Sequence, residues 1–160
     1  MLFHVSIEAD DPRRVAHVLA EIWGGEALPF PAVMPGSWAA LAGDRYGSMI
    51  EVYPRGTISR EGEGAAGAFG ERTAGQRFGS THLAIGTQLD GDAVAAIARS
   101  HGWSAKYCRR GGRFGLIELW VEGCLLVEVL TPEMQQEYME TVTIQNWREM
   151  LDEAQLAEAA

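Results

Sequence analysis

The sequence has few cysteines, a deficit of basic side chains and no long hydrophobic run. Only two of its 160 residues are cysteine, Cys108 and Cys124, and no CxxC spacing occurs, so we expect reduced thiols without a disulfide or metal role. Lysine and arginine total 13 against 22 aspartates and glutamates, which gives a formal net charge of −9 and disfavours a nucleic-acid partner. No segment approaches the roughly 20 apolar residues of a membrane span.

The amino terminus has no basic region followed by an apolar core, so no signal peptide is expected. Together with reduced cysteines, this predicts a cytoplasmic protein that does not contact a membrane. A hydrophobic fraction of 47% and a charged fraction of 22% are ordinary for a globular protein. The length suffices for one domain, or for two small modules that share a core.

One order of elements is predicted twice along the chain. Alternating apolar residues predict strands, and Asp-Pro or Asp-Gly-Asp followed by apolar residues at helical spacing predicts helices. In the first half, a helix from Asp11-Pro12 to Trp23 is expected between strands at 2–9, 26–30, 37–42 and 48–53. In the second half, a helix from Asp90 to about Gly102 is expected between strands at 81–87, 104–109, 115–121 and 124–130.

Each half carries one histidine on its first predicted strand and one glutamate on its last. These residues are His4 and Glu51, then His82 and Glu128, and the two spacings differ by one residue. Each is a polar side chain between apolar neighbours, so it lies on the face of the strand away from the core. Two carboxylates that converge on one place repel unless a proton or metal lies between them. The pattern therefore predicts one divalent-metal centre built from two copies of a motif.

This pattern resembles the vicinal oxygen chelate superfamily, which includes glyoxalase I, methylmalonyl-CoA epimerase, fosfomycin-resistance enzymes and extradiol dioxygenases. The resemblance covers about residues 2–130, and the His/Glu/His/Glu set is most similar to glyoxalase I. It implies an α+β fold of two tandem βαβββ modules forming a curved mixed sheet around a metal cleft. The expected parts are a first module at 1–54, a Gly/Arg-rich linker at 55–80, a second module at 81–131 and a C-terminal helical extension at 132–160.

The resemblance implies that His4, Glu51, His82 and Glu128 bind Zn, Ni, Co, Mn or Fe. Glu128 would shuttle a proton as the catalytic base, with Glu51 as the symmetric candidate. We expect a metal-dependent lyase or isomerase that stabilises an enolate or enediolate of a small molecule chelated through vicinal oxygens. Two alternatives stay open: an extradiol-type Fe(II) dioxygenase using only His4, His82 and Glu128, and a non-catalytic binding or resistance protein.

Several points stay open at the level of sequence. Glu128 follows its turn glycine by one residue more than Glu51 does, so either the turn is longer or Glu128 faces the other way, and the retained offset favours the longer turn. A homodimer is expected, and a metal within one chain or between two chains fits equally. The linker is either a tether or a lid, and the tail either covers the sheet or contacts a partner. Candidate substrate-binding residues are Arg77, Arg109 and Arg113.

Overall fold

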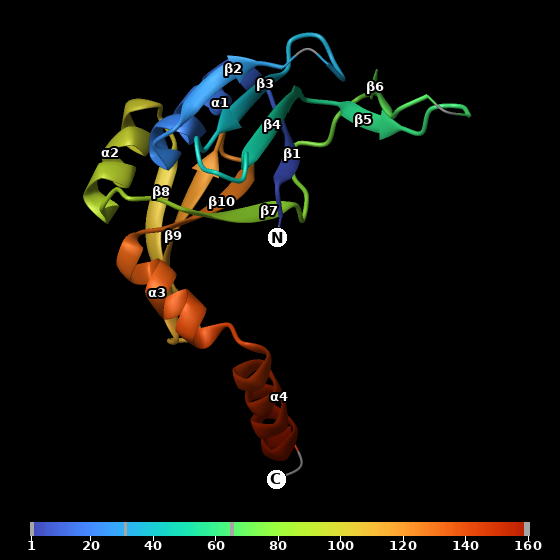
Figure 1. The fold of residues 1–160 in the computed structure, drawn as a ribbon. Helices are drawn as coiled ribbons and strands as arrows, with labels where there is room; N and C mark the ends of the chain where they lie inside the picture. The colour runs from blue at the N-terminus through green and yellow to red at the C-terminus, as the bar shows by residue number, and fades with distance from the viewer. Residues whose placement is uncertain (1, 31, 65, 159–160) are drawn as a thin grey trace.

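The computed structural model describes residues 2–30, 32–64 and 66–158 and contains a strand–helix–three-strand unit twice (Figure 1). The predicted α+β class and the βαβββ order of both units are confirmed. The first unit comprises β1 (His4–Ala9), α1 (Pro12–Trp23), β2 (Glu26–Pro29), β3 (Trp38–Leu41) and β4 (Met49–Pro54). The second comprises β7 (His82–Gly86), α2 (Gly91–Ser100), β8 (Ser104–Arg110), β9 (Phe114–Val121) and β10 (Leu125–Leu130).

Each unit forms its own four-stranded mixed sheet. The strand orders are β1-β4-β3-β2 and β7-β10-β9-β8. In both sheets the first strand runs parallel to the last, and the other neighbours are antiparallel. The strand that carries the histidine is therefore hydrogen-bonded to the strand that carries the glutamate, as the repeat requires.

Local sequence explains why each unit folds this way. Helix α1 begins where the Asp11 carboxylate accepts the Arg14 N–H at 3.0 Å, with proline in its first turn, and it ends at Gly24, whose φ of 76° is left-handed. Its apolar face packs on the inward faces of β1 and β4, and apolar residues of the second unit join the same core. The fully buried side chains include Val15, Leu19, Ile22, Ile50, Val52, Val94, Leu119, Val127 and Val129.

The segment between the units contains a hairpin that the sequence analysis did not predict. Strands β5 (Thr57–Arg60) and β6 (Phe69–Arg72) pair antiparallel and form a separate two-stranded sheet. The hairpin extends to one side of the body (Figure 1). Its glycine- and charge-rich sequence lacks the apolar alternation by which strands are recognised, because neither of its faces is packed against a core.

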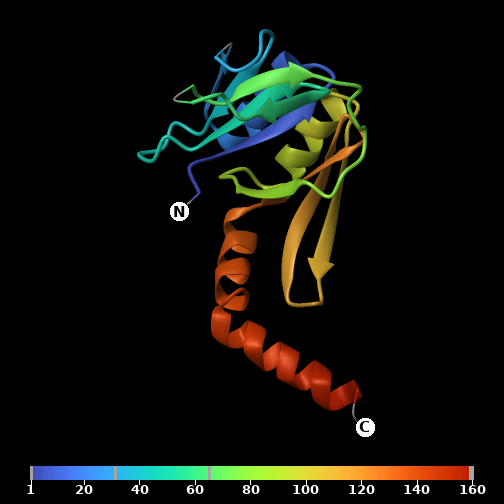
Figure 2. The same ribbon diagram turned by 90° about the vertical axis from the view of Figure 1, so that its right-hand side faces the viewer.

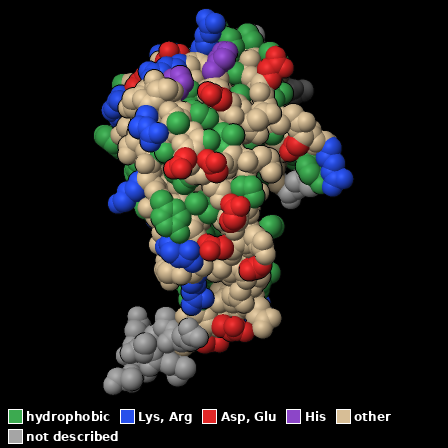
Figure 3. Space-filling model, turned by 90° about the vertical axis from the view of Figure 1, so that its left-hand side faces the viewer, with side chains coloured by type: hydrophobic (Ala, Val, Ile, Leu, Met, Phe, Trp, Pro, Cys, Tyr) green, Lys and Arg blue, Asp and Glu red, His purple; other side chains and the backbone are tan. Residues whose placement is uncertain are grey.

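The chain ends in two helices, α3 (Pro132–Thr141) and α4 (Ile144–Glu158), which break at the predicted β-branched run. Figure 2 shows α3 leaving the body beside the β8–β9 hairpin and α4 continuing beyond it. No helix among the described residues is both long enough and apolar enough to cross a membrane. Acidic and basic side chains are interspersed over the face shown in Figure 3.

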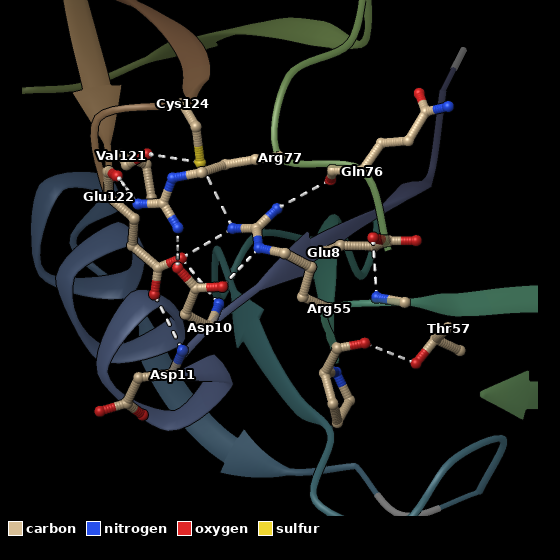
Figure 4. Close-up of polar contacts among 12 residues, drawn as sticks. Glu8, Asp10, Asp11, Arg55, Thr57, Gln76, Arg77, Val121, Glu122 and Cys124 are labelled. Atoms are coloured by element: carbon tan, nitrogen blue, oxygen red, sulfur yellow. Dashed lines mark hydrogen bonds and ion pairs between the residues drawn. The ribbon is translucent and has the colours of Figure 1, made fainter. Parts of the chain in front are cut away.

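A cluster of ion pairs joins the two units (Figure 4). Glu122, in the β9–β10 turn, accepts the backbone N–H groups of Asp10 and Asp11 at 2.7 and 2.8 Å and the Arg55 guanidinium at 2.9 Å. Arg55 also pairs with Asp10, which Arg77 contacts at 2.7 Å. These contacts tie the start of α1 to the far end of the second sheet, and they hold the two sheets in a fixed relation.

Candidate metal centre

His4 and Glu51 form a first half-site on the sheet of the first unit. The parallel register pairs Ser6 with Glu51, and His4 lies two residues before Ser6, so all three lie on one face. Glu51 is only 7% exposed, and its Oε2 accepts hydrogen bonds from the Ser6 and Tyr53 hydroxyls, both at 2.7 Å. Among the described residues, these are the only hydrogen bonds to the carboxylate, so Oε1 keeps its lone pairs.

Tyr53 fixes the protonation pattern of this half-site. Burial raises the pKa of Tyr53 to about 12, and the hydrogen bond to Glu51 raises it further in the same direction. The hydroxyl therefore stays protonated at neutral pH and acts as a donor to Glu51. The carboxylate is held in one orientation by two neutral donors.

His82 and Glu128 form a second half-site in the same register as the first. His82 pairs with Leu126, two residues before Glu128, just as His4 pairs with Met49, two residues before Glu51. Strand β10 begins one residue before its first partner in β7, whereas β4 begins at its first partner in β1. This extra residue absorbs the shifted spacing, and Glu128 lies on the same face as His82.

The second half-site opens into a cavity of about 490 Å³, which both His82 and Glu128 line. The His82 Nδ1 lies 3.0 Å from the carbonyl oxygen of Ser80. A carbonyl can only accept, so Nδ1 carries the proton in the neutral ring and the lone pair is on Nε2. A ring nitrogen held in this way by a backbone carbonyl is the usual arrangement of a metal-binding histidine.

Glu128 has a cationic partner that the sequence analysis did not assign to the site. The Arg110 guanidinium contacts Glu128 Oε1 at 2.5 Å through Nη2 and at 3.2 Å through Nε, and it contacts Glu118 at 2.9 Å. The hydrogen bond to Glu128 raises the pKa of Arg110. The basic turn at the end of β8 was the available signal, but the sequence does not show which of its arginines reaches across the sheet.

The three arginines predicted to bind substrate lie in different places. Arg113 lines the cavity of the second half-site. Arg77 lines another cavity, of about 340 Å³, which is also lined by Ser6 and Tyr53 of the first half-site. Arg109 points elsewhere and contacts Glu137 at 3.3 Å. The structure thus places Arg113 beside His82 and Glu128, and Arg77 on the side of the first half-site.

The two half-sites do not meet within one chain. Within residues 2–30, 32–64 and 66–158, no group of three or more histidine, cysteine, aspartate or glutamate side chains is placed to hold a metal ion. One chain therefore presents two matched pairs, each with one imidazole and one carboxylate. The two cysteines are unpaired, as predicted.

Known structures share this fold at low sequence identity. No protein-family model and no curated protein sequence matches the chain. The fosfomycin resistance protein FosX of Listeria monocytogenes is 15% identical with a TM-score of 0.56, covering 88% of this chain and 97% of that one. Lactoylglutathione lyase of Agrobacterium tumefaciens is 16% identical with a TM-score of 0.53, covering 81% and 91%. The fold expected from the vicinal oxygen chelate resemblance is confirmed, and at these identities the likeness concerns the fold alone.

Proposed function

We propose that two copies of this chain form a divalent-metal enzyme of the glyoxalase-like type, a lyase or isomerase. Its substrate would be a small molecule that offers two vicinal oxygens. His4 and Glu51 of one copy would hold the metal together with His82 and Glu128 of the other. The observation that carries the proposal is the identical strand register of the two His/Glu pairs, on sheets that do not bring them together in one chain.

The side chains present fit such an ion. Two imidazole nitrogens and two carboxylate oxygens suit Zn, Ni, Co, Mn or Fe(II). The tautomer of His82 directs a lone pair away from Ser80, and Glu51 keeps an oxygen that accepts no hydrogen bond from the described residues. Two carboxylates at one centre also need a counter-charge, which a divalent ion supplies.

The chain's own groups would move the proton. When bound, the metal supplies Lewis-acid stabilisation of the negative charge that develops on a substrate oxygen. Glu128 would accept the proton from the carbon next to the carbonyl and return it to the neighbouring carbon, so that no redox partner is needed. Arg110 holds this carboxylate ionised and in position beside the cavity. Glu51 is the symmetric candidate, but its two hydroxyl donors restrict its movement.

Structures with this fold support the assignment of metal and ligand class. The FosX protein of Listeria monocytogenes is described in complex with Mn(II) and 1S,2S-dihydroxypropylphosphonic acid, and in complex with Mn(II) and sulfate. The same arrangement of strands thus accommodates a divalent ion and a small oxygen-rich anion in that protein. This supports a metal-dependent role for the matched residues here.

One observation favours a second candidate, an Fe(II) dioxygenase. Glu51 is nearly buried and is held by Ser6 and Tyr53, which suits a carboxylate that supports the site from outside the ligand set. His4, His82 and Glu128 would then form the set of two histidines and one carboxylate that is typical of non-haem iron oxygenases. Iron dependence with oxygen uptake on a catechol would distinguish this candidate from the first.

Metal content and proton exchange test the proposal together. We expect about one divalent ion per chain in chelator-free protein, and we expect His4→Ala to weaken binding by more than about 100-fold, because even outer-shell partners contribute about 10- to 100-fold. Solvent exchange of the C–H protons of dihydroxyacetone in D₂O, followed by NMR, reports the proton transfer.

Glu128→Gln should abolish exchange and keep most of the metal. Glu71→Gln, on the exposed β5–β6 hairpin, is the matched control and should change neither. Protein that cannot be loaded with metal would contradict the proposal, as would full exchange activity in Glu128→Gln.

A further inference from the structure

The C-terminal helices form one wall of the cavity at the second half-site. His82 and Glu128 line one end of this cavity of about 490 Å³, and Tyr138, Trp147 and Met150 of α3 and α4 line the other. The arrangement is visible in Figure 2, where α3 and the β8–β9 hairpin run side by side below the sheet. The extension therefore belongs to a binding cavity and is more than an appendage to the fold.

The first helix of this wall is fixed to the sheet by specific contacts. The Gln135 side-chain amide donates to the carbonyl oxygens of Thr87 and Leu130 at 2.9 and 3.0 Å. Glu137 accepts the backbone N–H of Gly115 at 2.7 Å. The Tyr138 ring meets the Phe114 ring edge to face at 5.1 Å. Helix α3 is thus held along the β9 strand before any ligand arrives.

The second helix is fixed to the first at the turn between them. The Asn146 side chain donates to the carbonyl oxygens of Glu140 and Thr141 at 2.8 and 3.1 Å, and Thr143 caps α4 by accepting the Asn146 N–H at 3.1 Å. Trp147 follows directly and lines the cavity, yet it is 54% exposed. An aromatic side chain held at the wall of a cavity but only half covered is suited to stacking on a ligand.

The polar end of the cavity is basic, although the whole chain is acidic. Its charged lining consists of Arg110 and Arg113 against the single carboxylate of Glu128, in a chain of formal net charge −9. Arg110 is also anchored by Glu118 at 2.9 Å, so it keeps a fixed position if Glu128 turns toward another partner. Guanidinium groups held in this way recognise carboxylate, phosphate or phosphonate groups.

We propose that this cavity binds an organic anion with an aromatic or similarly flat apolar body, the anionic group lying toward Arg110 and Arg113 and the body lying against Trp147 and Tyr138. As the substrate class of the metal site this rests on the proposed function, because the same cavity contains His82 and Glu128. Trp147 is a specificity-determining residue: it contacts the body of the ligand and not its reacting oxygens.

Three small probes separate the two ends of the cavity. Phenylphosphonate carries both features, methylphosphonate carries only the anion, and benzylamine carries the ring with the opposite charge. Binding is measured by titration calorimetry, once with a chelator and once with added Mn²⁺. We expect phenylphosphonate to bind about tenfold more tightly than methylphosphonate, because a stacked ring adds burial to the shared anion contact, and we expect benzylamine not to bind.

Two variants on one helix make the test specific. Trp147→Ala should weaken phenylphosphonate binding about tenfold and leave methylphosphonate unchanged. Ile144→Ala is the matched control, because Ile144 is 76% exposed on the same helix and does not line the cavity. It should change neither affinity.

The outcomes distinguish this inference from the proposed function. Binding with chelator that depends on Trp147 supports the cavity even if the protein takes up no metal. Equal affinities for phenylphosphonate and methylphosphonate in metal-loaded protein would overturn the inference and leave the metal centre intact. A Trp147→Ala variant that changes the oligomeric state but no probe affinity would also overturn it, since α4 would then contact a second copy instead of a ligand.

Discussion

The ion-pair cluster around Glu122 should be essential for holding the two units together. Its side chain is only 10% exposed and accepts hydrogen bonds from two backbone N–H groups and from Arg55, whose own side chain is 16% exposed. Hydrogen bonds to charged groups contribute about 1.5–3 kcal/mol each when protected from water. The two N–H groups lie near the surface, where water can replace part of the contact. We therefore expect Glu122→Ala to lower the free energy of unfolding by about 2–3 kcal/mol.

The backbone of Glu122 offers an internal comparison. Its φ of 50° is left-handed, a conformation that costs a non-glycine residue about 1–2 kcal/mol. Glu122→Gly loses the same contacts as Glu122→Ala but relieves this cost, so it should be about 1 kcal/mol more stable than the alanine variant. Urea denaturation followed by tryptophan fluorescence measures both, with buried Trp103 among the reporters.

A surface ion pair provides the control for this prediction. Arg60 and Glu71 are 53% and 47% exposed, so Glu71→Gln should cost no more than about 1 kcal/mol. A Glu122→Ala variant within about 0.5 kcal/mol of the parent would refute the role of the cluster, since that is the range of ordinary surface substitutions. A glycine variant less stable than the alanine variant would refute the argument from backbone conformation.

Three further predictions concern packing, charge at the site and pH. Gly25→Ala should destabilise by more than about 3 kcal/mol in thermal denaturation, because its Cβ would overlap a backbone carbonyl of β3, while Gly24→Ala meets no atom and should cost only about 1 kcal/mol; equal effects would contradict this packing. Arg110→Gln should raise the affinity for Mn²⁺ about fivefold in a chelator competition assay, because a partly exposed cation beside a ligand carboxylate opposes the metal by about 1 kcal/mol; an unchanged affinity would count against this site. The hydrogen bond from Arg55 holds the pKa of Asp10 below its ordinary 3.8, so Asp10 stabilises the fold above that pH and loses this effect as the pH falls through its folded pKa. The destabilisation by Asp10→Asn should accordingly be present at pH 7 and shrink below 3.8 in urea titrations; a constant effect would contradict the pairing.

The two half-sites hold their carboxylates by different means. Glu51 accepts from the neutral hydroxyls of Ser6 and Tyr53, whereas Glu128 faces the cation of Arg110. The position of Ser6 is taken by Ala84 in the second unit, so no hydroxyl is available there. A carboxylate that exchanges one cation for another is better suited to leave and re-enter a metal site than one restrained by two neutral donors. This asymmetry supports Glu128 as the mobile base.

The sequence predicts the elements well because their signals are local. Strand alternation, Asp-Pro caps and paired glycines near residues 11–12 and 24–25 specify each βαβββ unit without reference to distant residues. The matched His/Glu spacing also indicates which side chains share a face. Register follows from the apolar pattern, because a slip of one residue would expose the core face of β10.

The relations between distant segments could not be predicted in the same way. Glu122 meets Asp10 and Arg55 only because the two sheets pack in one particular arrangement, and no local pattern records that contact. The reach of Arg110 to Glu128 depends on the pairing of β8, β9 and β10. The separation of the half-sites is likewise a property of how the units pack, so repeat spacing alone left the arrangement of the metal centre open.

The most direct test of the proposed centre is complementation between two inactive chains. His4→Ala and His82→Ala chains, each with a different affinity tag, are co-expressed, and the mixed dimer is isolated and analysed for metal. In a site shared by two chains, the mixed dimer keeps one intact set of His4, Glu51, His82 and Glu128, so we predict one tightly bound divalent ion per mixed dimer and none in either variant alone. A mixed dimer as metal-free as its parents, beside parent protein that binds metal, would contradict the shared centre.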